Sequence, residues 1–298
     1  MLEILQSFLN LVPVTLGQSL IYGFVAVGIM IPFRMLDLPD LTCEGSFPLG
    51  GCLFAAALMW GVPAPLALVM AVAAGFAAGC ATALIHLQFR IHTLLAGILV
   101  FTMLWSVNLR IMGKPNIPIP TGSAAFGAWS APIFDSTNLS NLLFAALAIV
   151  AVALMYWLFT TEVGLRMRCV GANQRLSPAL GIDIRRYVIG GMGLAGAFCA
   201  LSGVLVVQTQ TFADVTMGFG ILINGLAALI IGESLLGRHS VLRQLAAPIL
   251  GSIVYYQLVS LGLALGLQPS DLKFATGVFV LAALGLPALW KKRRAQTG

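Results

Sequence analysis

Arginine is concentrated in one internal stretch of the chain. Residues 161–187, "TEVGLRMRCVGANQRLSPALGIDIRRY", carry five arginines, although only 9% of all residues are charged. Such a concentration of arginine around a short helix could mark a surface that docks on a cytosolic partner. Cytoplasmic loops of membrane proteins also collect basic residues, because these residues set the topology. Both interpretations of the stretch remain open at this point.

Polar side chains near or inside apolar runs are the second group that could do chemistry. Such groups are costly in hydrocarbon, and they often line a transport route. Each one, taken singly, also serves as a helix cap or a hydrogen-bonded structural residue. The candidates for a translocation pathway are Asp40, Thr42, Glu44, Asn108, Gln208, Thr209, Asp214 and Asn224.

Catalytic and metal chemistry have little support in the sequence. The five cysteines form no CxxC pair, and His86, His92 and His239 lack the spacing of metal ligands. A membrane enzyme would need His, Asp or Ser groups that converge at one membrane face. We therefore expect no metal site and no catalytic residue. We also expect no nucleic-acid partner, because the basic residues of so apolar a chain report cytoplasmic loops.

Composition defines the fold class. The chain has 298 residues, of which 59% are hydrophobic, whereas soluble domains contain roughly 25% charged residues. A transmembrane helix needs about 20 mostly apolar residues. The sequence therefore predicts an all-α polytopic membrane protein with about nine transmembrane helices. The apolar runs are 12–33, 45–61, 64–87, 91–113, 139–160, 187–208, 218–236, 244–266 and 273–290.

Basic residues orient these spans. With the tail that contains Lys291, Lys292, Arg293 and Arg294 in the cytoplasm, 13 of the 16 basic residues fall on the cytoplasmic side. This places the C-terminus inside and the N-terminus outside. The stretch with five arginines then becomes a cytoplasmic loop.

Two short matching segments predict inverted repeats. Asp40-Leu41-Thr42 and Asp214-Val215-Thr216 each lie in a polar break between two apolar runs, on opposite sides of the predicted membrane. Broken helices in inverted repeats frame the central pathway of many transporters. At the first break, Pro39 disfavours helix at the preceding residue and Gly45 permits a tight reversal. The predicted single domain comprises repeat one (12–113), a linking span (139–160), a loop (161–186), repeat two (187–290) and a basic tail (291–298).

The arginine-rich loop has the pattern of a short helix. Leu176, Ala179 and Leu180 form one apolar edge at i, i+3 and i+4. Ser177 could cap a helix whose first residue is Pro178, and Gly181 lies where such a helix would end. A short amphipathic helix outside the membrane suggests docking into a groove on a cytosolic partner.

These residues carry a resemblance to a known family. "EVGLRMRCVGANQRLSPALGIDIRRY" resembles the cytoplasmic coupling segment of ABC-importer permeases of the branched-chain amino acid and ribose class. "SLIYGFVAVGIMIPFRMLDLPDLTCEGSFPLGG" and "GGMGLAGAFCALSGVLVVQTQTF" are similar to the first and post-loop spans of that class. The chain looks closest to a branch linked to aromatic amino acid import. It departs from the usual pattern at Pro178 and at Glu233, which could contact a partner or Arg238.

The resemblance implies a type II ABC importer-like fold in a bacterial inner membrane. The chain itself would hold no cofactor, since ATP and Mg would bind to a separate cytosolic ABC ATPase dimer. The other implied partners are a second permease copy, giving a homodimer, and an extracytoplasmic substrate-binding protein that delivers an amino acid or similar small polar metabolite. The residues implied in ATPase coupling are Gly164, Arg166, Arg168, Gly171, Asn173, Arg175, Leu180, Gly181 and Ile182.

An ion-coupled secondary transporter is the alternative, because such proteins also use inverted repeats. It requires ionisable residues deep in the bundle, and transport that ionophores abolish. The apolar runs contain almost no charge, which argues against a proton relay.

Overall fold

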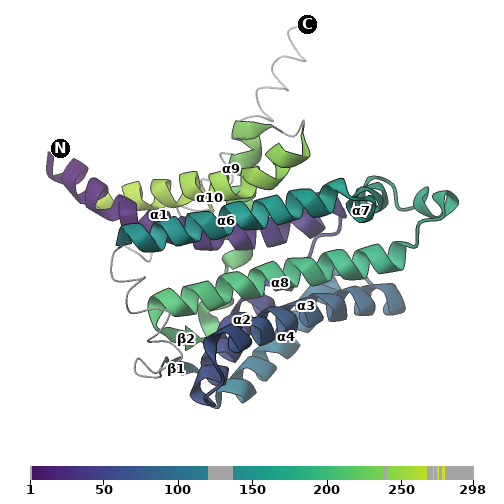
Figure 1. Ribbon diagram of the computed structural model, residues 1–298, viewed down its shortest axis with the longest axis horizontal. Coiled ribbons are helices and arrows are strands. Elements are labelled where there is room, and N and C mark those ends of the chain that lie inside the picture. The colour runs from purple at the N-terminus through teal and green to yellow at the C-terminus, as the bar shows by residue number, and fades with distance from the viewer. Residues whose placement is uncertain are drawn as a thin grey trace, which may run out of the picture.

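The apolar runs fold into long helices that lie roughly side by side (Figure 1). The computed structural model describes residues 2–119, 137–237 and 240–266, and isolated positions between 271 and 278. The first half contains α1 (Leu2–Met30), a π-helical turn (Ile31–Met35), α2 (Cys43–Met59), α3 (Ala64–Phe89), α4 (Thr93–Met112) and β1 (Asn116–Pro118). The second half contains α6 (Thr137–Thr160), α7 (Glu162–Ala172), a 3-10 turn (Ser177–Leu180), α8 (Ile184–Gln210), β2 (Phe212–Asp214), a 3-10 turn (Val215–Gly218), α9 (Ile221–Leu236) and α10 (Val241–Ala264).

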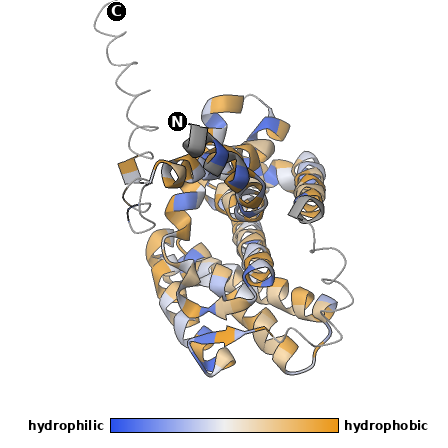
Figure 2. Ribbon diagram, turned by 90° about the vertical axis from the view of Figure 1, so that its left-hand side faces the viewer, coloured by the Kyte–Doolittle hydropathy of each residue, from blue (hydrophilic) through white to orange (hydrophobic). Residues whose placement is uncertain are grey.

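The predicted class of fold, an all-helical polytopic membrane protein, is confirmed. Seven stretches of the described residues are long and apolar enough to cross a membrane. Hydrophobic ribbon colours dominate when the bundle is viewed from the left side of Figure 1 (Figure 2). The run 45–61 was predicted as a full span, but α2 has only 17 residues. At 1.5 Å per residue it covers about 25 Å, less than the hydrocarbon core of about 30 Å. The ninth run, 273–290, lies outside the described residues, so the count of nine stays a prediction.

A small strand pair joins the two halves at one end of the bundle. β1 follows α4 and β2 follows α8, and they pair antiparallel with Asn116 opposite Asp214. The ends of α4 and α8 therefore lie on the same side, as the predicted topology requires. α7 lies at the opposite end (Figure 1).

Helix packing follows the inverted-repeat pattern. α1 packs against α9 and α10, and its counterpart α8 packs against α2 and α3. The two Asp-x-Thr segments also form the same turn. The backbone N–H and the hydroxyl of Thr42 both donate to Asp40 Oδ1, and those of Thr216 both donate to Asp214 Oδ1. The weak three-residue match in the sequence is thus a repeated local structure.

Candidate translocation site and coupling loop

The starts of α2 and α9, which follow the two breaks, meet inside the bundle. Glu44, in the first turn of α2, accepts a hydrogen bond from the Gly220 N–H at the start of α9, with an O–N distance of 3.2 Å. These residues lie 176 positions apart in the chain. A Cβ on Gly218 would lie 2.1 Å from the Glu44 carbonyl oxygen, so the two backbones touch. The N-terminal ends of both short helices, which carry partial positive charge, therefore converge.

The reversal before α2 is made differently from the prediction. Gly45 is helical and buried, where a Cβ would lie 2.9 Å from Leu104. The residue with left-handed backbone is Asp37, with φ +54°. The small size of Gly45 thus permits close packing of α2 on α4, and the turn itself occurs eight residues earlier.

The first break carries a carboxyl group into the interior. Asp40 is 4% exposed and lies near Ala195 and Cys199, close to the middle of α8. The Thr42 hydroxyl, which donates to Asp40, lies 2.7 Å from the Thr82 hydroxyl of α3. The apolar runs are nearly free of charge, but the break between them places Asp40 at mid-depth. A search of the apolar runs alone therefore misses this group.

The paired turns offer a matched test of this buried network. We expect Thr42→Val to lower the free energy of unfolding by about 1–3 kcal/mol, because it removes a hydroxyl from a buried carboxyl and from Thr82. Thr216→Val removes the same hydroxyl from an exposed turn and should cost less than about 1 kcal/mol. Thermal unfolding of both variants in detergent measures the difference, and equal melting temperatures would contradict the prediction.

The other pathway candidates separate into two groups. Asn224, one turn into α9, accepts a hydrogen bond from the Tyr255 hydroxyl at 3.1 Å, beside the stacked rings of Tyr22 and Tyr256. Asn108 is 1% exposed, and its amide has no hydrogen-bond partner. Asn224 lies in α9 and Asn108 in α4, and both helices pack near the contact between Glu44 and Gly220.

Gln208, Thr209 and Asp214 are not part of this interior group. Gln208 and Thr209 lie in the last turn of α8, and the Thr209 hydroxyl donates to the Val206 carbonyl of its own helix. Asp214 lies in β2, at the end of the bundle. Their sequence context did not separate them from Asp40 and Glu44. Among the described residues, no cluster of three His, Cys, Asp or Glu side chains could hold a metal ion.

The arginine-rich loop folds into two pieces. Residues Glu162–Ala172 form α7, a helix that sequence analysis missed, with Gly164, Met167 and Val170 buried at a three-residue spacing. The predicted short helix is a single 3-10 turn, Ser177–Leu180, which ends at Gly181 with φ +72°. Ser177 does not cap it, because the hydroxyl donates to the Cys169 and Asn173 carbonyls.

The loop exposes the side chains that were predicted to meet a partner. Leu176 and Leu180 are 56% and 63% exposed, and Arg175 is also exposed. Asn173 Oδ1 accepts the backbone N–H groups of Arg175 and Leu176, which holds this part of the loop in shape.

The remaining predicted coupling residues connect the loop to the bundle. Arg166 is exposed, and a hydrogen bond with Tyr187 and the charge of Glu162 raise its pKa. Arg168 is half-buried. Ile182 packs against the main hydrophobic core, which anchors the end of the loop.

Two glycines seat α7 on the helices next to it. A Cβ on Gly171 would lie 1.9 Å from the Met35 carbonyl oxygen, and one on Gly164 would lie 2.3 Å from the Phe159 Cα. α7 therefore lies in direct backbone contact with the π-helical turn that ends α1. π-helical turns occur frequently at functional sites.

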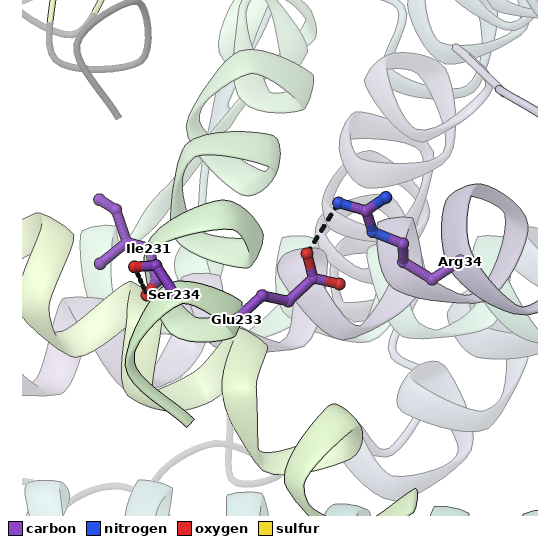
Figure 3. Close-up of polar contacts among 4 residues, drawn as sticks. All are labelled: Arg34, Ile231, Glu233 and Ser234. Carbon is purple, nitrogen blue, oxygen red and sulfur yellow. Dashed lines mark hydrogen bonds and ion pairs between the residues drawn. The ribbon is translucent and has the colours of Figure 1, made fainter. Parts of the chain in front are cut away.

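An ion pair continues this contact to α9. Arg34, in the π-helical turn, lies 2.7 Å from the Glu233 carboxylate, and the two side chains are 36% and 6% exposed (Figure 3). Among the described residues, Arg34 pairs with Glu233, and the expected contact of Glu233 with Arg238 or a partner stays a prediction. Arg238 lies outside the described residues. The sequence does not signal this pair, because its members are 199 positions apart.

These features define a class of protein. Inverted repeats, two short helices that meet in the interior and an exposed loop seated on the bundle are the architecture of a membrane transport permease. The family model for the branched-chain amino acid transport system permease component matches residues 13–286, and the chain belongs to this family. It is a multi-pass membrane permease of the ABC-importer type.

Individual relatives agree with this assignment. The chain is 36% identical to a tyrosine transport system permease protein of Clostridioides difficile, over 90% of this chain and 88% of the relative. It is 32% identical to an uncharacterised protein of Rickettsia prowazekii, over 93% and 97%. It is 24% identical to the ribose import permease protein of Escherichia coli, over 73% and 67%. No solved structure gives a significant match.

Proposed function

We propose that this chain is the non-catalytic, membrane-spanning subunit of an ATP-driven importer of an amino acid or similar small polar metabolite. A cytosolic ATPase dimer supplies the energy, and an extracytoplasmic binding protein delivers the substrate. The observation that carries the proposal is the exposed loop of α7 and its 3-10 turn, seated on α1 through Gly171. The loop combines exposed leucines with cationic arginines, which suits an acidic groove on a partner.

Contacts on the chain provide a route for the motion. ATPase closure would displace α7, and α7 touches the π-helical turn at Met35. Arg34 of that turn pairs with Glu233 near the end of α9, and the start of α9 lies beside Glu44 in the interior. A displacement of the loop would therefore move α9, one of the two short helices, α2 and α9, whose starts meet in the interior and which we call half-helices. Coupling of this kind requires two discrete arrangements with different affinity for the partner.

The position of Glu44 supports a second copy of the chain as a partner. The Glu44 side chain is half-buried at the start of α2, where the half-helices meet. A carboxylate at this depth cannot face lipid at low cost. We propose that this face lines an aqueous route between two copies, with both C-termini in the cytoplasm. The tyrosine transport permease of C. difficile supports an amino acid as substrate.

Co-purification tests the proposal. From its native membrane in mild detergent, the tagged chain should retain a nucleotide-binding subunit that mass spectrometry identifies. The variant Arg168→Ala/Arg175→Ala should lose most of it, since each pair of opposite charges at an interface contributes affinity and on-rate. The control Arg185→Ala/Arg186→Ala removes the same charge from the start of α8.

Two outcomes would contradict the proposal. One is an equal loss of the ATPase in both double variants, which would make the arginines a general positive patch. The other is the absence of any ATPase together with substrate uptake that ionophores abolish, which would indicate ion-coupled transport.

A further inference from the structure

Three aromatic rings gather where the half-helices meet. Phe219, between the 3-10 turn and α9, lies 5.8 Å from Phe101 and 5.1 Å from Trp105 of α4, measured between ring centroids. Phe219 is 50% exposed, so much of its ring is available to another group. The next residue along the chain is Gly220, whose N–H donates to Glu44. One half-exposed ring and one half-buried carboxylate therefore lie beside each other at the start of α9.

A lipid-facing surface does not explain this combination. A ring alone would be stable against acyl chains, but the neighbouring carboxylate would not. The Glu44 carboxylate accepts backbone N–H groups of Gly220 and Leu222, so it caps the positive end of α9. The group thus offers an aromatic face and a carboxylate held at a helix end within one small region.

An unsatisfied amide lies on the same side of α4. Asn108 follows Phe101 by seven residues and Trp105 by three, so helical geometry places all three on one face. Its side chain is 1% exposed, and neither its Nδ2 nor its Oδ1 atom has a hydrogen-bond partner. A buried amide without partners is costly, and ligand sites are a common place for such groups.

We infer that these residues form a binding site for a zwitterionic amino acid with an aromatic side chain, an inference that rests on the importer role proposed above. The substrate ring packs against Phe219, and its ammonium group faces Glu44. Asn108 supplies a further polar contact. Ring packing in offset or edge-to-face geometry favours an aromatic over an aliphatic side chain.

Saturation-transfer NMR on the purified full-length chain tests the site, because the method detects weak ligands. The probe is L-phenylalanine, with L-leucine and 3-phenylpropionate as comparison ligands that lack the ring and the ammonium group respectively. We expect L-phenylalanine to bind more tightly than either. Phe219→Ala should raise its dissociation constant about threefold to tenfold. The control Phe89→Ala removes a ring that is 71% exposed at the far end of α3, and should change nothing.

The variant Glu44→Gln tests the contribution of the negative charge while keeping the local fold. The glutamine oxygen can still accept the Gly220 N–H, so the start of α9 is kept while the negative charge is lost. L-phenylalanine should then bind about tenfold more weakly, whereas 3-phenylpropionate should bind at least as well as before.

Three results would overturn the site: equal affinity of Phe219→Ala and Phe89→Ala, L-leucine binding as tightly as L-phenylalanine, or a Glu44→Gln variant that weakens both aromatic ligands equally. ATPase co-purification is scored on the same preparation. If the ATPase is retained and the ligand pattern fails, the binding site is wrong and the importer role stands. If the ATPase is absent and ionophores abolish substrate uptake, the importer role itself fails.

Discussion

Replacing Gly171 by alanine is expected to uncouple the permease from the proposed ATPase while leaving the helices in the membrane. The added Cβ would lie 1.9 Å from the Met35 carbonyl oxygen and 2.9 Å from the Leu36 Cα. Both are backbone atoms, so no side chain can rotate away, and α7 must move off the end of α1. Overpacking of this kind costs about 1–3 kcal/mol. If α7 transmits the motion, substrate uptake per ATP hydrolysed should fall about tenfold or more, as a loss of that size in the coupled state implies.

Gly190 provides the control for this variant. It also lies in a helix, α8, but a Cβ there would meet no atom within 4 Å. Gly190→Ala should therefore keep full coupling and stabilise the protein by about 0.5–1 kcal/mol through its better helix propensity. Uptake and ATP hydrolysis are measured together in proteoliposomes. The role of the α7 contact would be disproved by a Gly171→Ala protein that matches Gly190→Ala in uptake per ATP.

Breaking the Arg34–Glu233 ion pair should have the second largest effect. A double-mutant cycle of Arg34→Gln, Glu233→Gln and their combination should give a coupling energy of about 1–3 kcal/mol, since the Glu233 side chain is only 6% exposed. Both single variants should also lower uptake more than ATP hydrolysis, because the pair ties the end of α1 to α9. Chemical or thermal unfolding in detergent gives the stability values.

An exposed pair of the same kind calibrates the measurement. Arg186 and Asp183 lie 3.1 Å apart, but their side chains are 85% and 54% exposed. A cycle of Arg186→Gln and Asp183→Asn should give less than about 1 kcal/mol, as surface pairs usually do. A restored uptake in the reversed protein Arg34→Glu/Glu233→Arg would support the pair as a mechanical link. If the two cycles give equal energies and uptake is unchanged, the buried pair has no special role.

Hydropathy and charge were sufficient to predict the class of fold and the position of most helices. Runs such as 64–87 and 139–160 lie within a few residues of α3 and α6, because a helix in lipid must satisfy its own backbone and hide it behind apolar side chains. The Asp-x-Thr repeat also pointed to equivalent turns, since an Asx turn depends on residues only two positions apart. Gly181 correctly predicted where the short turn ends, whereas the turn starts at Ser177, one residue before the predicted Pro178.

Other features were decided only by the tertiary structure. α2 is as apolar as a true span, so its sequence cannot show that it begins in the interior beside Gly220. The contacts Glu44–Gly220 and Arg34–Glu233 join residues 176 and 199 positions apart, and neither has a local pattern. The resemblance named Gly171 as a coupling residue, but its contact with the Met35 carbonyl likewise has no local pattern. Local sequence therefore determined most of the membrane helices, because these depend on neighbouring residues and on the membrane. The site and its link to α7 depend on which backbones approach each other, and only the packing of the whole chain decides that.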